Sequence, residues 1–415
     1  MRFRKLLFWI HLIAGVVTGL VVGIMCVTGT AIAFEKELIA WAARDARQAD
    51  PSAGPAMEVE ALLARIAQES PETEITALVF DKDPGTVVIA RAGRQEALYV
   101  DPYSGELREP GAAGMRRFMQ VMTAWHRWLG TEGDSRPIGK AITGASNLAF
   151  LVLLLTGLYL WVPRQWSKRA LRPILWFVKG AKGKARDWNW HNVLGLWTAP
   201  VMLVIIVSGV VISYPWASNL VYQLAGEEPP QGRGGPGGPA GDRPLVEPPP
   251  GVEKLAYSAL LQHAQQAVPR WQQITLSIDN PAAPLRRPGP GRGQAGAEAS
   301  RGGGEGKRGP RETGAAAVSI AVKESGGWPL FASAQISLNP YTGEVLTASR
   351  FQDQSPGRQV RSWLRFLHTG EAFGFWGKFI AAVVSLAGGV LVWTGFAMAL
   401  NRLRRWLKRR RYPQA

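Results

Sequence analysis

The stretch Phe8-Trp9-Ile10-His11-Leu12-Ile13-Ala14-Gly15 recurs 180 residues later as Trp188-Asn189-Trp190-His191-Asn192-Val193-Leu194-Gly195. In both copies a histidine opens a long apolar segment and a glycine follows four residues later. A second glycine lies at the same further distance, as Gly29 and Gly209. This ungapped match predicts an internal duplication. Two imidazoles placed by a duplication can face each other across a pseudo-two-fold axis, which is the geometry that a bis-histidine haem requires.

A second set of internal matches is spaced by 238 residues. The matched pairs are Asp101-Pro102-Tyr103-Ser104-Gly105-Glu106 with Asn339-Pro340-Tyr341-Thr342-Gly343-Glu344, Gly139-Lys140 with Gly377-Lys378, and Thr156-Gly157 with Thr394-Gly395. Each half is therefore predicted to contain a helix, a small helix-and-sheet module that ends at the Pro-Gly turn, an amphipathic segment and a second helix.

Four long apolar segments contain no Asp, Glu, Lys or Arg. They cover residues 6–34, 141–162, 193–214 and 379–400. A membrane-spanning helix needs about 20 apolar residues. The sequence therefore predicts a membrane α-helical bundle of four transmembrane helices, with internal duplication and two periplasmic α+β modules.

Basic residues flank these segments on one predicted side. Eighteen Lys and Arg residues lie before the first segment, between the second and third, and after the fourth, against one acid, Asp187. Because positive charge marks the cytoplasmic side, both termini are predicted to be cytoplasmic in a bacterial inner membrane, and the two long loops periplasmic. These residues account for the whole net charge of +17. Contact with membrane lipid then explains the basicity, and no nucleic-acid partner is expected.

The patterns divide the chain into ten predicted segments. Transmembrane helices are assigned to 6–34, 139–162, 190–215 and 376–400, modules to 35–113 and 216–358, amphipathic helices to 114–138 and 359–375, and the basic loop and tail to 163–189 and 401–415. The first helix is too long for a signal peptide and is interpreted as a retained anchor. Two stretches rich in Gly, Pro and Arg, 226–251 and 284–314, are predicted to be disordered because they lack apolar residues for a core.

Four of the five histidines occupy paired positions beside the apolar segments. His11 and His191 lie near the predicted cytoplasmic side, whereas His126 and His368 precede the second and fourth segments on the other side. The members of the second pair are 242 residues apart, one helical turn more than the 238-residue spacing. His263 falls on a predicted surface helix and is given no ligand role.

Haem is the cofactor that these patterns favour. A polar side chain within a spanning helix usually has a partner, and a b-type haem takes one imidazole from each of two helices. Small residues follow each histidine at four-residue steps and leave a face open to a flat ring. They are Gly15, Gly19 and Gly23 after His11, and Gly195 and Ala199 after His191. Plain helix packing and contact with lipid head groups are the alternatives for these glycines and histidines; the pairing of four histidines favours ligation.

Other kinds of site fit the sequence less well. The lone cysteine, Cys26, allows no disulfide and no C-x-x-C-H attachment, so a haem would be non-covalent. Zinc is disfavoured because no carboxylate or thiol completes a tetrahedral set. Ion transport is disfavoured because the four apolar segments contain histidine but no Asp, Glu, Lys or Arg that would mark an ion pathway.

Several motifs together resemble the PepSY-associated transmembrane family, which includes iron-regulated inner-membrane proteins and periplasm-facing ferric-siderophore reductases. They are Trp9-Ile10-His11, the two Pro-Gly turns, His126-Arg127-Trp128-Leu129, Thr156-Gly157-Leu158-Tyr159-Leu160-Trp161, Trp190-His191-Asn192 and Leu367-His368-Thr369-Gly370-Glu371. The resemblance covers nearly the whole chain. The chain departs from the family pattern in the two insertions and in Gly395-Phe396-Ala397-Met398, which replaces an aromatic-rich ending.

The resemblance implies two PepSY-like modules and, in its reductase branch, two b haems that pass electrons outward. His11 with His191 would bind the cytoplasmic-side haem, and His126 with His368 the other. The expected activity is reduction of a periplasmic acceptor, with an Fe(III)-siderophore as the favoured acceptor and with electrons from an unidentified cytoplasmic or membrane donor. The alternatives are a haem-free protein that binds peptides or regulates a periplasmic protease, and a redox subunit that passes electrons to a protein partner.

Overall fold

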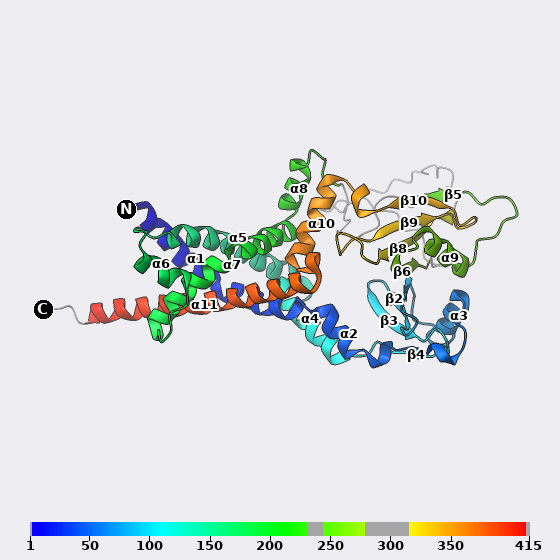
Figure 1. The fold of residues 1–415 in the computed structure, drawn as a ribbon, viewed down its shortest axis with the longest axis horizontal. Coiled ribbons are helices and arrows are strands. Elements are labelled where there is room, and N and C mark those ends of the chain that lie inside the picture. Colours follow the sequence, from blue (N-terminus) through cyan, green and yellow to red (C-terminus); the bar gives the residue numbers. More distant parts are fainter. Residues whose placement is uncertain (1, 231–243, 279–314, 412–415) are drawn as a thin grey trace, which may run out of the picture.

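The computed structural model describes residues 2–230, 244–278 and 315–411. Its four helices long and apolar enough to cross a membrane are α1 (Arg2–Ile32), α5 (Arg136–Trp161), α7 (Gly183–Ser213) and α11 (Gly374–Arg411), which confirms the four predicted spans. Helices α1 and α7 each pack against both α5 and α11, so they stand at opposite corners of the bundle. Both termini lie at one end of this bundle and the β-sheet lies at the other (Figure 1).

Two further helices cover the end of the bundle nearest the sheet. Helix α4 (Ala113–Trp128) packs against α1 and α5, and α10 (Pro356–His368) packs against α7. Each then turns sharply into the next spanning helix. The backbone takes positive φ angles at Leu129 and Gly130 after α4, and at Gly370 after α10. These turns determine where the ends of α4 and α10 meet the bundle.

The strands predicted for two modules join in one eight-stranded antiparallel sheet. Its order is β10-β9-β8-β6-β1-β2-β3-β4, and the halves meet where β1 pairs with β6 from Ala77↔Ser277 to Asp81↔Gln273. Helices α3 and α9 contribute to one common apolar core with this sheet. The bounds are β1 (Ala77–Asp81), β2 (Val88–Ala92), β3 (Gln95–Val100), β4 (Leu107–Arg108), β6 (Trp271–Ser277), β8 (Val318–Glu324), β9 (Ala334–Leu338), β10 (Val345–Ser349), α3 (Val59–Glu69) and α9 (Tyr257–Ala267).

Burial along the strands explains the single core. In β8 and β9 every second residue is buried, as expected when one face of a sheet is covered and the other is not. Ile274 and Ile320 are fully buried, as is Leu78 from the other half. Because these side chains belong to one cluster, the two halves of the sheet stabilise each other.

The structure departs from the sequence prediction in several connecting segments. Within 226–251, which was predicted to be disordered, β5 (Leu245–Val246) pairs with β7 (Ala315–Ala316). The other predicted insertion, 284–314, lies outside the described residues. Helix α11 continues to Arg411, through most of the segment predicted as a basic tail. The remaining helices are α2 (Glu35–Ala42), α6 (Lys168–Leu175), α8 (Pro215–Leu224), and the short 3-10 turns η1 (Asp45–Arg47), η2 (Pro51–Ala53), η3 (Gly133–Ser135), η4 (Phe351–Asp353) and η5 (Glu371–Phe373).

Candidate functional site: two facing pairs of histidines

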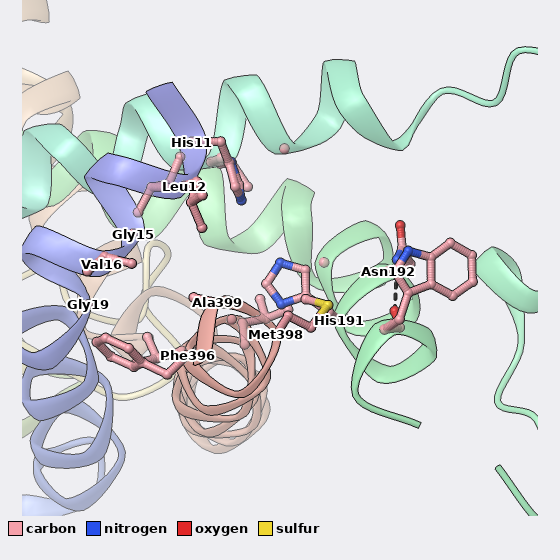
Figure 2. Close-up of a pocket in the computed structure, with 18 of the residues that line it drawn as sticks. His11, Leu12, Gly15, Val16, Gly19, His191, Asn192, Phe396, Met398 and Ala399 are labelled. Carbon is pink, nitrogen blue, oxygen red and sulfur yellow. Dashed lines mark hydrogen bonds between the residues drawn. The ribbon is translucent and has the colours of Figure 1, made fainter. Parts of the chain in front are cut away.

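The first pair lies at the end of the bundle that carries both termini. His11 of α1 and His191 of α7 face each other with ring centres 6.3 Å apart and ring planes at 86°. Both line a cavity of about 430 Å³, called here the terminal-end cavity. Figure 2 shows the two imidazoles on opposite sides of a space that Gly15 and Gly19 of α1 also border.

The second pair lies at the sheet end. His126 of α4 and His368 of α10 also have ring centres 6.3 Å apart, with planes at 60°. They line a separate cavity of about 210 Å³, called here the sheet-end cavity. The structure therefore brings together both pairs of histidines that the sequence matched.

The separation of the rings suits one metal atom between each pair. A metal–imidazole bond is about 2 Å long, and a five-membered ring with bonds of about 1.35 Å has each atom roughly 1.1 Å from its centre. Two imidazoles bound to opposite sides of one metal therefore have centres about 6 Å apart. Both pairs have this separation, and two opposed ligands are what a haem iron takes from a protein.

Hydrogen bonds at the sheet end fix which nitrogen of each ring carries the proton. Nδ1 of His126 lies 3.0 Å from the carbonyl oxygen of Met25, and Nδ1 of His368 lies 2.9 Å from that of Ile205. A carbonyl oxygen can only accept, so Nδ1 donates in both rings. Nε2 is then unprotonated and free to bind a metal, as second-shell contacts of metal-binding histidines commonly arrange.

The terminal-end histidines use threonine hydroxyls in the same way. Nδ1 of His11 lies 3.0 Å from Oγ1 of Thr156, and Nδ1 of His191 lies 2.9 Å from Oγ1 of Thr394. Each hydroxyl donates its own hydrogen to a carbonyl of its helix, at 2.6 Å from Thr156 to Val152 and 2.9 Å for Thr394. The hydroxyls therefore accept from Nδ1, and Nε2 is again free.

A glycine follows the hydroxyl residue beside every one of these four histidines. We call these dipeptides the hydroxyl–glycine pairs: Thr156-Gly157 beside His11, Thr394-Gly395 beside His191, Thr28-Gly29 beside His126, and Ser208-Gly209 beside His368. A Cβ added to the glycine would lie 3.2 Å from Cε1 of His11, His126 or His368, and 3.7 Å from Cε1 of His191. The imidazoles thus lie against bare backbone of a neighbouring helix.

Sequence reasoning missed this role of the hydroxyl–glycine pairs. In the sequence, Gly29, Gly209, Thr156-Gly157 and Thr394-Gly395 were used only as evidence of an internal repeat. The available signal was a Ser-Gly or Thr-Gly dipeptide in every one of the four spans, although the first and second spans each contain a further one, Thr18-Gly19 and Thr143-Gly144. Each pair contacts a histidine from a different helix, so no single segment of sequence reveals the contact.

The small residues predicted to form a face for a flat ring divide into two groups. Gly15, Gly19 and Gly195 line the terminal-end cavity. A Cβ on Gly23, by contrast, would lie 3.4 Å from Cγ1 of Val392, and Ala199 is buried in the apolar core of the bundle. For these two residues the helix-packing alternative holds.

The terminal-end cavity combines apolar walls with basic groups at its rim. Lys184, Arg402 and Arg405 are the charged residues among the described residues that line it. The guanidinium of Arg402 also lies over the rings of Phe8 and Trp9, 5.0 and 5.1 Å from their centres. A flat apolar ring with carboxylate substituents matches this lining, since the walls accept the ring and the cations accept the carboxylates.

The sheet-end cavity has a mixed rim. It is lined by Glu35, Lys36, Glu371 and Lys378, and Lys36 forms an ion pair with Glu371 at 2.8 Å. Oγ1 of Thr123, on the cavity wall one turn before His126, is buried without a hydrogen-bond partner in the described structure. A buried hydroxyl left unpaired is a site where a ligand or water supplies the missing partner.

The two cavities share part of their lining. His11 and Thr28 are 17 residues apart on α1, which corresponds to roughly 25 Å at about 1.5 Å per residue. Val22, Phe150 and Met202 line both cavities. Groups bound in the two cavities would therefore face each other across these three side chains.

His263 takes no part in either pair. Its ring lies against Gly343 in the Pro-Gly turn of the second half, so close that a Cβ there would collide with it. Arg65 holds the matching place beside Gly105 in the first half. The contact indicates a structural role for His263, in keeping with the sequence interpretation.

Comparison with known proteins places this arrangement in a family. A search of curated proteins found no match to the chain. The profile of the PepSY-associated TM region matches residues 8–402, a range that contains all four paired histidines and the sheet. The chain is a membrane protein of the PepSY-associated TM region family.

Proposed function

We propose that this protein is a di-haem b electron-transfer protein of the bacterial inner membrane. His11 and His191 would bind one haem through their Nε2 atoms, and His126 and His368 the other. The observation that carries the proposal is the pair of matched separations of 6.3 Å, each between imidazoles whose Nδ1 atoms are already hydrogen-bonded. Two such centres at different depths are typical of electron transfer across a membrane.

The protein's own residues would hold and tune these centres. The Nδ1 contacts orient the rings, the glycines allow close approach of the imidazoles to neighbouring helices, and the apolar walls keep water from the terminal-end centre. When bound, haem supplies a one-electron Fe(III)/Fe(II) couple. Lys184, Arg402 and Arg405 would receive the carboxylates of the terminal-end haem.

The proposed direction of transfer follows from charge. The eighteen basic residues that flank the spans belong to the start of α1, the segment between α5 and α7 with the first turn of α7, and the end of α11. Figure 1 shows these segments together at the end of the bundle opposite the sheet, so this end is assigned to the cytoplasm and the sheet to the periplasm. Electrons from a cytoplasmic or membrane donor would enter at the terminal end and leave at the sheet end. The proposed acceptor is a periplasmic Fe(III)-siderophore, in which one electron converts Fe(III) to Fe(II) and weakens its binding to the chelator.

Haem content tests the proposal directly. Protein purified from haem-replete cells is expected to show a low-spin bis-imidazole spectrum and two haems per chain in a pyridine haemochrome assay. Replacing His11 and His191 by Ala should leave one haem, and so should replacing His126 and His368. The matched control, His263→Ala, should keep both. Absence of haem, or full haem content in both double variants, would refute the assignment and favour the haem-free alternative.

Acceptor specificity needs a second experiment. The dithionite-reduced protein, freed of excess reductant, is mixed anaerobically with a ferric hydroxamate or ferric catecholate, while the haem spectrum and trapped Fe(II) are followed. Reoxidation of the haems with one Fe(II) formed for each haem reoxidised supports siderophore reduction. A protein that binds haem but is not reoxidised by any ferric chelate would instead support transfer to a protein partner.

A further inference from the structure

The loop between β8 and β9 differs from the matching connection in the first half. Residues 325–333 read Ser-Gly-Gly-Trp-Pro-Leu-Phe-Ala-Ser and contain no charged side chain. The matching connection between β2 and β3 is a tight turn at Gly93 and Arg94, and Arg94 is exposed. The second half of the sheet therefore carries an apolar loop where the first half has a short polar turn.

Aromatic contacts join this loop to the bundle. The ring of Phe331 stacks on that of Phe366 in α10, with centres 4.1 Å apart and planes at 13°. Phe331 also meets Trp363 edge-on at 5.1 Å. The ring of Trp328 lies 6.3 Å from that of Phe373, just before α11. The loop thus reaches back from the sheet to the end of the bundle, beside the helix that carries His368.

Large apolar side chains remain exposed around these contacts. Leu330 lies beside Gly374, where a Cβ would be 3.3 Å from its Cδ1. The exposed fractions of Trp328 and Leu330 are 65% and 46%. Phe373, just before α11, is also exposed, as are Phe375 and Trp376 in the first turn of α11. We call these five side chains the aromatic patch.

We propose that the aromatic patch lies in the interfacial layer of the bilayer, so that the β8–β9 loop anchors the sheet to the membrane surface. Helix α11 crosses the membrane, and its exposed lipid-facing side chains begin at Phe375 and Trp376 and continue with Phe379 and Ile380. The loop is continuous with this surface through Leu330 and Gly374. Tryptophan and phenylalanine are favoured at the depth of the lipid head groups, whereas in water this exposed area would be costly.

The anchor holds only the second half of the sheet to the membrane. Through Phe331, Trp363 and Phe366 it also fixes α10 against the loop, and α10 ends at His368. The inference does not depend on haem binding. It predicts that the bilayer restrains the loop, while the matching turn at Arg94 remains in water.

Single-cysteine labelling in nanodiscs tests the inference. Cys26 is the one cysteine of the chain and is buried, so C26A provides the background. A polarity-sensitive fluorophore is attached at L330C or, separately, at W328C, and its emission is compared in nanodiscs with ordinary and brominated phosphatidylcholine. The matched control is R94C in the other half, and F379C in α11 marks full lipid contact.

The expected result is blue-shifted emission at 330 and 328 that brominated lipid quenches, as at 379, with no quenching at 94. The proposal would be overturned if the labels at 328 and 330 both emit as in water and are not quenched by brominated lipid, while the label at 379 is quenched. Burial of the loop labels without quenching by brominated lipid would also overturn it, because it would indicate a protein partner on the patch.

Discussion

Cε1 of His126 lies 3.2 Å from the point where a Cβ on Gly29 would stand. This contact gives α1 two roles, because the helix carries His11 at one end and supports His126 at the other. Helix α7 has the same two roles, with His191 near its start and Gly209 beside His368. Each site is therefore built from residues of both diagonal helices, so the packing of the bundle and the geometry of the sites depend on each other.

On the proposed di-haem assignment, Gly29→Ala is expected to prevent haem binding at the sheet end and to leave the terminal-end haem bound. The added methyl group would stand within tight contact of the imidazole, and the ring has no free space on the helix side. Gly209→Ala should act in the same way through His368. Haem content should fall from two per chain to one, with the remaining haem serving as the control in the same molecule. Retention of both haems with an unchanged low-spin spectrum would contradict the expectation.

On the same assignment, Thr394→Val should weaken haem binding specifically at the terminal end. Valine matches threonine in shape but cannot accept the Nδ1–H of His191, and Thr394 is only 1% exposed, so water does not replace the hydroxyl. Loss of a second-shell hydrogen bond of this kind typically lowers affinity about 10–100-fold. Transfer of haem to apomyoglobin measures the loss, and an optical redox titration measures the accompanying change in potential.

Thr394→Ser is the matched control, since it keeps the hydroxyl. Its haem loss and potential should stay near those of the parent protein. Equal behaviour of the Val and Ser variants would show that the hydroxyl has no influence on His191.

A pH-dependent contact links the sheet to α4. Arg116 of α4 donates to Glu96 of β3 at 2.8 Å, and the Tyr99 hydroxyl donates to the same carboxylate at 2.7 Å. Burial alone raises the pKa of Glu96, but the bonds from Tyr99 and Arg116 outweigh it and hold the pKa below its ordinary value. Burial and the bond to Glu96 raise the pKa of Tyr99 to about 12. The carboxylate is therefore the group that titrates on the acid side.

The sign of the effect follows from the lowered pKa. Stability from this contact is fully present above the unfolded pKa of about 4.3 and is lost as pH falls through the lower folded value. Glu96→Gln should therefore lower the thermal midpoint at pH 7 and make little difference at the acid limit. Melting curves of both proteins across this range measure the difference. A gap between the two midpoints that does not shrink on acidification would contradict the prediction.

The spacing of His126 and His368 shows what sequence could and could not predict. The repeat paired these residues only approximately, because they miss the common spacing by four residues. Thirteen residues separate His126 from Gly139, whereas nine separate His368 from Gly377. The four extra residues lie between His126 and η3, because α4 continues for two residues past His126 and the connection that follows is two residues longer, whereas α10 ends at His368. The two rings nevertheless face each other with centres 6.3 Å apart. The length of the apolar segments and the charges that flank them predict the spans, and the internal repeat identifies the four paired histidines.

Contacts between distant segments were not predictable in the same way. The joining of two modules through β1 and β6 depends on strand pairing across almost 200 residues, and alternation of burial within a strand does not specify its neighbour. The hydroxyl–glycine pairs likewise acquire their role only when another helix brings a histidine to them. The sequence therefore predicted the elements and the paired histidines, whereas the contacts that position the rings required the structure.

Gly377→Ala is expected to destabilise the protein and disturb the sheet-end site, even though alanine favours a helix by about 1 kcal/mol over glycine. Gly377 lies in the first turn of α11, and a Cβ there would collide with the carbonyl oxygen of Gly370 in the turn that follows α10. Backbone cannot move aside as a flexible side chain can, so the collision should cost more than the helix gains, by about 1–3 kcal/mol.

Gly389→Ala, in the same helix, is the matched control, because its Cβ would stand 4.0 Å from the nearest side chain. The control should be as stable as the parent or more so, while Gly377→Ala should melt earlier and lose the haem proposed between His126 and His368. Equal stability of the two variants would show that the turn between α10 and α11 tolerates a side chain at this point.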